Sequence, residues 1–114
     1  MAEAAEIPVP MLFELCSGGT AYEGKPQLKT RVKLDQALES LKASSRHTIL
    51  AYTPYMLIIK SQSGAEISIT NRGKLLIKRV DSEAAARDAA YEVMRITQQA
   101  FRTQPKTTPP TTNS

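Results

Sequence analysis

The stretch that decides the fold spans residues 55–101 and has the sequence YMLIIKSQSGAEISITNRGKLLIKRVDSEAAARDAAYEVMRITQQAF. Ile67 and Ile69 alternate with polar residues, a spacing typical of a β-strand with one buried face. The Asn-Arg-Gly-Lys sequence that follows predicts a tight hairpin turn, because Gly73 readily adopts the positive φ that such a turn needs. Leu75–Val80 is then predicted to be the strand that returns beside the first.

Downstream of the hairpin, the sequence predicts a long amphipathic helix over about Glu83–Phe101, immediately after Ser82. Glu83 and Arg87 lie one helical turn apart, so their charges attract each other. The residues that recur at helical spacing form one stripe, which consists of Ala86, Ala89, Ala90, Val93, Ile96, Thr97 and Ala100. A single stripe of this kind predicts a helix that packs on one face of the sheet.

Upstream of this stretch, the sequence predicts one more helix and further strands. Asp35 is a candidate N-cap for a short helix that carries Ala37, Leu38 and Leu41 on one face. Strands are predicted at Met11–Cys16, at Leu28–Leu34 and at Tyr52–Lys60, where Pro54 lies near the start of the strand. Because strands and helices do not alternate as βαβ units, the predicted fold class is α+β, an antiparallel sheet with both helices packed on one face.

The two ends of the chain differ in composition from its middle. Residues 1–10 contain two Glu, three Ala and two Pro without periodicity, and we expect a flexible N-terminal arm there. Residues 103–114 contain five Thr, three Pro and no large apolar residue, a composition that predicts a disordered tail. The sequence therefore predicts a single domain over residues 11–102.

Composition narrows the class of protein further. Lys and Arg number 15 against 11 Asp and Glu, so the net charge of +4 predicts a mild attraction to polyanions. The single cysteine excludes an intramolecular disulfide and a multi-cysteine zinc site. Because no signal-peptide-like or long apolar segment is found, we expect no membrane partner and a cytoplasmic location.

Some of these motifs resemble a known family. Asn71-Arg72-Gly73-Lys74-Leu75-Leu76-Ile77, followed by Ser82-Glu83-Ala84-Ala85-Ala86-Arg87, resembles one half of the TATA-box-binding protein. The resemblance covers roughly residues 34–96, about half of the chain. It implies a half-domain whose helices cover the convex face of the sheet. In that family the concave face lies in the DNA minor groove, with phenylalanines wedged between base steps.

The positions that contact DNA in that family carry different residues here. The alignment places Thr53 and Thr70 where the phenylalanines would be, and Glu14 near an asparagine that reads the groove. A threonine cannot unstack bases and a carboxylate is repelled by the groove, so the resemblance implies the fold without kinking of a TATA element. Residues 66–81 also resemble, more locally, the archaeal chromatin protein Alba, whose fold needs a hairpin after the helix where this chain has its tail.

The resemblance has a consequence for assembly, because the family contains two tandem halves and this chain contains one. A lone half leaves a sheet edge unpaired, so we expect a homodimer. On the same alignment, the face without helices carries apolar residues predicted to form the interface, namely Tyr55, Leu57, Ile59 and Leu76. The alternative is that the chain's own N-terminal segment covers this face.

Basic residues recur on two of the predicted elements. The candidates for contacts with nucleic-acid phosphates are Lys29, Arg31 and Lys33 on one strand face, Arg72 and Lys74 at the hairpin tip, and Lys78 beyond it. They predict a small module that binds DNA or RNA non-specifically or by shape. The alternatives are a solvated basic face and a non-catalytic subunit that assembles with other proteins through its apolar sheet face.

The sequence offers little for catalysis. Cys16 and His47 are the candidates for a nucleophile and a base, yet they lie about thirty residues apart with no third group to orient them. Ser17-Gly18-Gly19-Thr20 lacks the Gly-Lys-Ser/Thr ending of a phosphate-binding loop. We therefore expect a binding module rather than an enzyme, without a cofactor or a bound metal.

Overall fold

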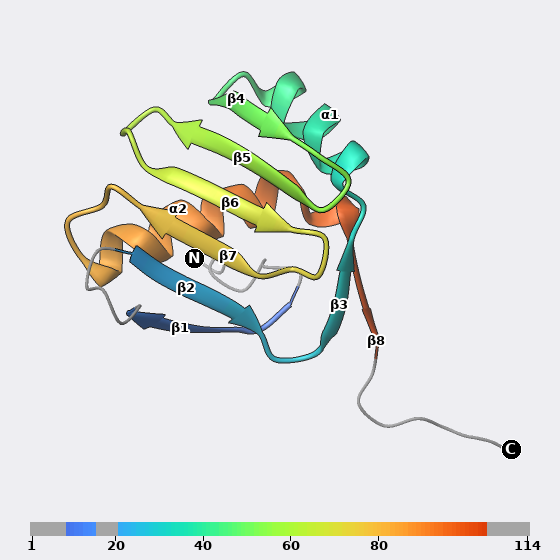
Figure 1. The fold of residues 1–114 in the computed structure, drawn as a ribbon, viewed down its shortest axis with the longest axis horizontal. Coiled ribbons are helices and arrows are strands. Elements are labelled where there is room, and N and C mark those ends of the chain that lie inside the picture. Colours follow the sequence, from blue (N-terminus) through green and yellow to red (C-terminus); the bar gives the residue numbers. More distant parts are fainter. Residues whose placement is uncertain (1–8, 16–20, 105–114) are drawn as a thin grey trace, which may run out of the picture.

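Across residues 9–15 and 21–104, which the computed structural model describes (Gln104 by its backbone only), the chain forms a six-stranded antiparallel sheet and a two-stranded ribbon. The sheet order is β1-β2-β7-β6-β5-β4, and β3 pairs with β8 in the ribbon (Figure 1). In chain order the elements are β1 (Met11–Leu15), β2 (Ala21–Pro26), β3 (Lys29–Val32), α1 (Leu34–Ser44), β4 (His47–Tyr52), β5 (Met56–Ser61), β6 (Glu66–Thr70), β7 (Leu75–Lys78), α2 (Glu83–Ile96), the 3-10 turn η2 (Gln98–Ala100) and β8 (Phe101–Gln104).

The path of the chain explains why distant segments meet. After β2 the chain leaves the sheet through β3 and α1 and re-enters it at the far edge as β4 (Figure 1). Strands β4 to β7 then run back as a meander, so that β7 pairs with β2, with Leu75 opposite Gly24. The hairpin predicted from the Asn-Arg-Gly-Lys turn is the β6–β7 pair, and Gly73 has the expected positive φ of 91°.

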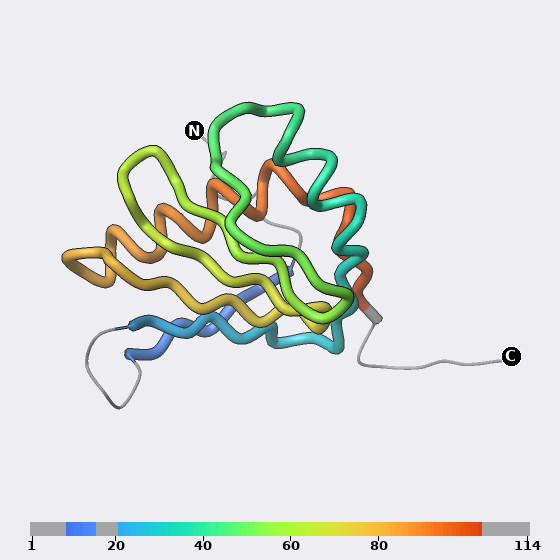
Figure 2. Tube along the Cα trace, turned by 45° about the horizontal axis from the view of Figure 1, so that its top comes forward, coloured from blue at the N-terminus to red at the C-terminus, as the bar shows by residue number. Residues whose placement is uncertain are grey.

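Both helices cover the same face of the sheet, with α1 over β4 and β5 and α2 over β2 and β7 (Figure 2). This arrangement confirms the predicted α+β class with an antiparallel sheet and both helices on one face. The core between the layers is apolar, and its largest fully buried side chains include Leu41, Leu57, Ile59, Ile67, Ile69, Leu75, Ile77, Val93 and Met94. Burial of this apolar surface is the main term that stabilises the domain.

The two helices begin in different ways. At α2, the Ser82 hydroxyl accepts a hydrogen bond from the Ala85 N–H at 3.1 Å, a standard N-cap, and Arg87 pairs with Glu83 as predicted. The predicted cap of α1 is wrong, because the helix starts at Leu34 and its N-cap is Lys33, two residues before Asp35. Asp35 lies inside the first turn, where its carboxylate accepts from the Gln36 N–H.

The C-terminal end of α2 corrects two predictions. The helix ends at Ile96 rather than Phe101, because the chain turns through η2 and continues as β8. Thr97 marks this change, since its buried hydroxyl donates to the Val93 carbonyl at 2.7 Å. The tail predicted from residue 103 also begins too early, because Thr103 and Gln104 belong to β8 and pair with β3; residues 105–114 lie outside the described residues.

Other boundaries differ for local reasons. The sequence did not reveal β2 or β4, and the strand expected at Tyr52–Lys60 is two strands with Pro54 in the turn between them. Strand β7 ends at Lys78, because Arg79 adopts a positive φ of 62°. At the N-terminus, Val9 falls within the predicted arm yet is only 1% exposed and belongs to the core. Residues 1–8 lie outside the described part of the chain.

The predicted interface is partly wrong. Leu57 pairs with Ile69 and Ile59 with Ile67, so both residues share the face that the helices cover, and both are fully buried. The residues of β5 that lie on the open face are Met56 and Ile58 instead. The apolar run of β5 has no alternation, so the sequence left its phase undetermined, and a shift of one residue moves every side chain to the other face.

Candidate functional site

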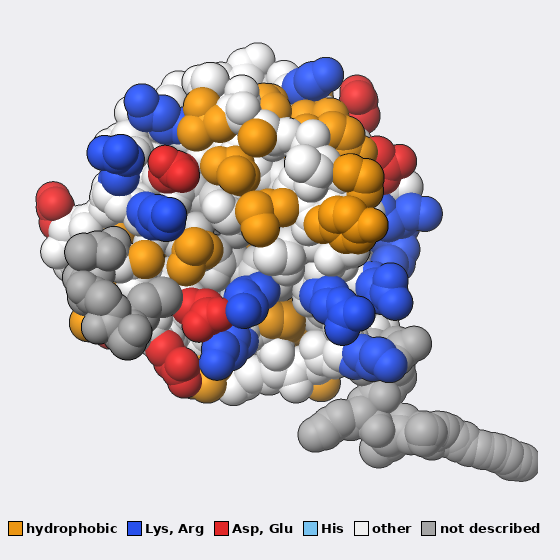
Figure 3. All heavy atoms as spheres, in the orientation of Figure 1, with side chains coloured by type: hydrophobic (Ala, Val, Ile, Leu, Met, Phe, Trp, Pro, Cys, Tyr) orange, Lys and Arg blue, Asp and Glu red, His pale blue; other side chains and the backbone are white. Residues whose placement is uncertain are grey.

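The face of the sheet opposite the helices is the first candidate surface. Side chains alternate across a strand, so the residues between the core positions of β2, β5, β6 and β7 lie here. They surround a hollow of about 430 Å³, which we call the sheet hollow, lined by Glu23, Met56, Ile58, Glu66, Ser68, Thr70, Lys74, Leu76 and Lys78. Figure 3 shows apolar side chains gathered over the middle of this face, with Lys and Arg around them.

Carboxylates neutralise part of the charge around the sheet hollow. The Lys74 ammonium lies 2.8 Å from a Glu23 carboxylate oxygen, and this hydrogen bond lowers the pKa of Glu23 against the opposing effect of burial. Arg79 lies 3.7 Å from Glu66 at the other end of β7. Of the predicted phosphate contacts, Lys74 therefore already has an anionic partner.

The β6–β7 hairpin tip lies against β3, which brings a second group of cations together. The Val32 N–H donates to the Asn71 carbonyl at 2.9 Å. Gly73 permits this close approach, because a Cβ at that position would lie only 2.8 Å from the Thr30 Cγ2. Arg72, between Asn71 and Gly73, is consequently held beside β3.

Lys29, Arg31 and Arg72 form what we call the basic cluster. Together with Leu28 and Thr30 they line one hollow of about 310 Å³. Within residues 9–15 and 21–104, none of these three cations has a carboxylate within ion-pair distance. The structure thus joins cations about forty residues apart in the sequence and leaves their charge available to an anion.

Arg102 adds a cation that the sequence analysis did not include. It lies directly opposite Arg31 in the β3–β8 ribbon, and directly opposed residues share a face. Its guanidinium donates to the backbone carbonyls of Gln99 and Phe101 and is otherwise exposed. Like charges directly opposite each other are unfavourable unless an anion lies nearby. The sequence did not predict this pairing, because it predicted a helix that continues to Phe101.

The remaining predicted cations lie at different distances from the basic cluster. Lys33 is exposed at the start of α1 and follows Arg31 by two residues. Lys78 lies at the opposite end of β7 from Lys74, roughly 13 Å away at the usual strand rise of about 3.3 Å per residue. Lys78 therefore borders the far side of the sheet hollow.

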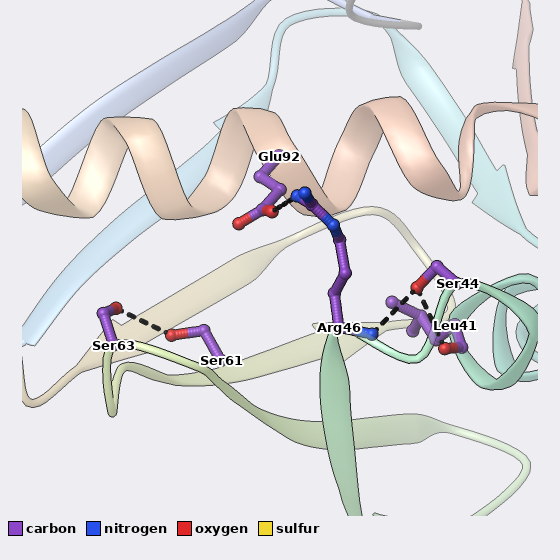
Figure 4. Close-up of polar contacts among 6 residues, drawn as sticks. All are labelled: Leu41, Ser44, Arg46, Ser61, Ser63 and Glu92. Atoms are coloured by element: carbon purple, nitrogen blue, oxygen red, sulfur yellow. Dashed lines mark hydrogen bonds and ion pairs between the residues drawn. The ribbon is translucent and has the colours of Figure 1, made fainter.

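His47, the candidate base, lies at the start of the edge strand β4. Burial lowers its pKa below the ordinary value of 6.5, and among the described residues its ring nitrogens have no hydrogen-bond partner. The adjacent Arg46 forms a 2.7 Å ion pair with Glu92 of α2, which ties this end of the sheet to the helix (Figure 4). Cys16, the candidate nucleophile, lies outside the described residues.

The described part of the chain contains no group of three or more His, Cys, Asp or Glu side chains placed to hold a metal ion. Within the same residues, neither α1 nor α2 has the length and hydropathy of a membrane-spanning helix. The hollow lined by the basic cluster and the sheet hollow are the two candidate binding surfaces.

Comparison with known proteins does not place the chain in a family. No family model, no curated protein and no solved structure matches it. The resemblances to the TATA-box-binding protein and to Alba therefore stay predictions from short sequence motifs.

Proposed function

We propose that this protein is a nucleic-acid-binding module that contacts phosphates through the basic cluster. The observation that carries the proposal is the convergence of Lys29, Arg31 and Arg72 on one hollow without a carboxylate partner among the described residues. Unpaired cations on neighbouring elements are the electrostatic footprint of phosphate recognition. Arginine is suited to this role because its planar guanidinium can bind two phosphate oxygens at once.

The proposal is for binding without strong base preference. Contacts with phosphates position a strand but carry no sequence information. Thr53 and Thr70 remain short polar side chains that cannot enter a base step; Thr70 uses its hydroxyl to accept from the Arg72 and Lys74 N–H groups within the hairpin. We therefore expect similar affinities for nucleic acids of different sequence.

The test is a titration of fluorescently labelled oligothymidylate, and of a DNA duplex of equal length, at a series of salt concentrations. Each phosphate contact contributes about 0.7 to the slope of log affinity against log salt for a single strand and about 0.9 for a duplex. The double variant Arg31→Gln, Arg72→Gln should therefore reduce the slope by about 1.4 to 1.8 and weaken binding at low salt.

The matched control is Lys42→Gln, Arg95→Gln, which removes the same charge from exposed positions in the last turns of α1 and α2. This control should leave the slope nearly unchanged. Equal effects of the two double variants would show that only net charge matters. Absence of binding to both probes at low salt would overturn the proposed function.

A second candidate function is protein assembly, favoured by the apolar lining of the sheet hollow. Met56, Ile58 and Leu76 lie there on the face opposite α1 and α2. In this alternative the chain forms a homodimer, or docks on another protein, through that face. Light scattering of the parent would then give a dimer mass at micromolar concentration. Ile58→Asp would convert it to a monomer, and Ile58→Val would not.

A further inference from the structure

Tyr55, in the turn between β4 and β5, presents an aromatic ring to solvent from an ordered backbone. Its side chain is 71% exposed. The turn itself is held by the Thr53 hydroxyl oxygen, which accepts from the N–H groups of Tyr55 at 3.1 Å and Met56 at 3.0 Å. The position of the ring is thus restrained by the backbone while its faces stay accessible.

Backbone hydrogen bonds tie this turn to the basic cluster. The Asn71 N–H donates to the Tyr55 carbonyl at 2.9 Å, and the Asn71 carbonyl accepts from the Val32 N–H at 2.9 Å. Asn71 precedes Arg72, and Val32 follows Arg31, so backbone hydrogen bonds connect Tyr55 to segments that carry two guanidinium groups of the basic cluster. Figure 3 shows apolar side chains near the β4–β5 turn and Lys and Arg side chains over β3 on the same face of the molecule.

The same turn leads into the sheet hollow. Met56 follows Tyr55 directly and lines that hollow together with Ile58 and Leu76. The basic cluster, the exposed ring of Tyr55 and the apolar lining of the sheet hollow are thus connected through residues that are adjacent in the chain or hydrogen-bonded through the backbone. Nucleic acid with unpaired bases has the complementary order of charged backbone and flat apolar faces.

We propose that the site takes a single strand of nucleic acid, with phosphates on the basic cluster, one base stacked on Tyr55 and the following base over the sheet hollow. This inference rests on the proposed function and narrows its ligand from any polyanion to an unpaired strand. Stacking on an aromatic ring suits every base, because each base has a π-face. A duplex keeps its bases stacked inside and offers Tyr55 only sugar and phosphate.

The test compares labelled oligothymidylate with a DNA duplex of equal length, for the parent and three variants. Tyr55→Ala should weaken single-strand binding about tenfold, within the range measured for loss of one stacking side chain, and leave duplex binding unchanged. Tyr55→Phe should retain the parent's affinity, because the ring remains. Leu15→Ala removes another exposed apolar side chain, 55% accessible, from β1 and should change neither affinity.

Tyrosine fluorescence supplies a second readout that a change in stability would not mimic. Stacking of a base on Tyr55 should quench part of the parent's emission, and this quenching should be smaller in Tyr55→Phe although the strand still binds. Equal affinities for single strand and duplex, with no effect of Tyr55→Ala, would overturn this inference and leave the proposed function standing. No binding to either probe would overturn both and favour a protein partner for this face.

Discussion

The two faces of the sheet are built from the same strands but differ in what covers them. Under α1 and α2, Leu57 and Ile59 have no accessible surface, whereas Ile58 between them is partly exposed on the open face. Adjacent residues of β5 therefore belong to different environments. The helix-covered face therefore determines stability, whereas the open face and the hollow beside β3 carry the surfaces proposed to bind.

The cations of the open face and those of the basic cluster differ in whether carboxylates lie close to them. Lys74 and Arg79 have Glu23 and Glu66 as partners, whereas the basic cluster has no carboxylate partner among the described residues. An exposed ion pair contributes little to stability, but its carboxylate competes with an incoming phosphate. Nearness of a carboxylate, more than the number of cations, thus distinguishes the two surfaces.

We expect the largest loss of stability from a charge placed on the helix-covered face. Val93→Asp places a carboxylate in α2 at a position with no accessible surface and no cationic partner in the core. The expected cost is about 4 kcal/mol or more, a large share of the stability of a domain, which is about 5–15 kcal/mol. Circular dichroism melting should show loss of the folded state. Ala84→Asp, exposed in the first turn of the same helix, should melt like the parent.

Two substitutions in β5 compare how much each face of the sheet contributes to the free energy of unfolding, and both should have smaller effects than Val93→Asp. Leu57→Ala removes a fully buried side chain and should lower the free energy of unfolding by about 2–5 kcal/mol. Ile58→Ala, on the open face, should lower it by about 1 kcal/mol or less. Urea denaturation of both variants measures the difference. Equal losses would show that the open face is buried as deeply as the helix-covered one.

A substitution of Glu23 tests whether a carboxylate beside a cation weakens the binding of phosphate. Under the proposed function, Glu23→Gln removes a carboxylate that repels an incoming phosphate beside Lys74. We expect affinity for oligothymidylate to rise a few-fold at low salt. Glu39→Gln on the exposed side of α1 makes the same charge change and should raise affinity less. An equal rise in both variants would contradict a local role for Glu23.

The smallest effect that we expect is a decrease in folding stability at acidic pH that depends on His47. Burial lowers the pKa of this imidazole below 6.5, with Glu92 raising it and Arg46 lowering it to lesser extents. The unfolded state therefore takes up the proton more readily, so the stability from neutral His47 is present above pH 6.5 and is lost as pH falls through the folded pKa. His47→Gln should abolish this part of the decline.

The measurement is urea unfolding of the parent and of His47→Gln at one pH above 6.5 and one moderately below it. Glu23 is a separate contributor at lower pH, since its depressed pKa gives stability that is lost only below its ordinary value of 4.5. A parent whose stability is constant between the two pH values would contradict the role assigned to His47.

The elements that the sequence predicts well are those with a regular local pattern. The β6–β7 hairpin follows from alternation and from Gly73, and α2 follows from its apolar stripe and its Ser82 cap. Strand β3 shows the same regularity, because Thr30 and Val32 are buried and Lys29 and Arg31 exposed, as their alternation predicts. Strand β2 contains Gly24 and ends at Pro26, and β4 ends in the continuous apolar run Ile49–Tyr52, so neither shows a clear alternation.

The candidate site is predictable only in part. Sequence reasoning selects Lys29, Arg31 and Arg72 as cations on neighbouring elements, but nothing in their spacing shows that they line one hollow. Their contact depends on the docking of the β6–β7 tip against β3, which in turn depends on the space left by Gly73. Arg102 joins these cations only because β8 pairs with β3 in the folded chain.

The α+β class, the long helix, the hairpin and the exposed basic row of β3 follow from the sequence alone, because they depend on residues within a few positions of one another. Three features require the tertiary structure: Leu57 and Ile59 face the helices, Glu23 pairs with Lys74, and the backbone of Tyr55 connects to the basic cluster. Those outcomes depend on pairing between segments far apart in the chain. Such pairing is selected by the packing of the whole core, because each local pattern permits more than one partner.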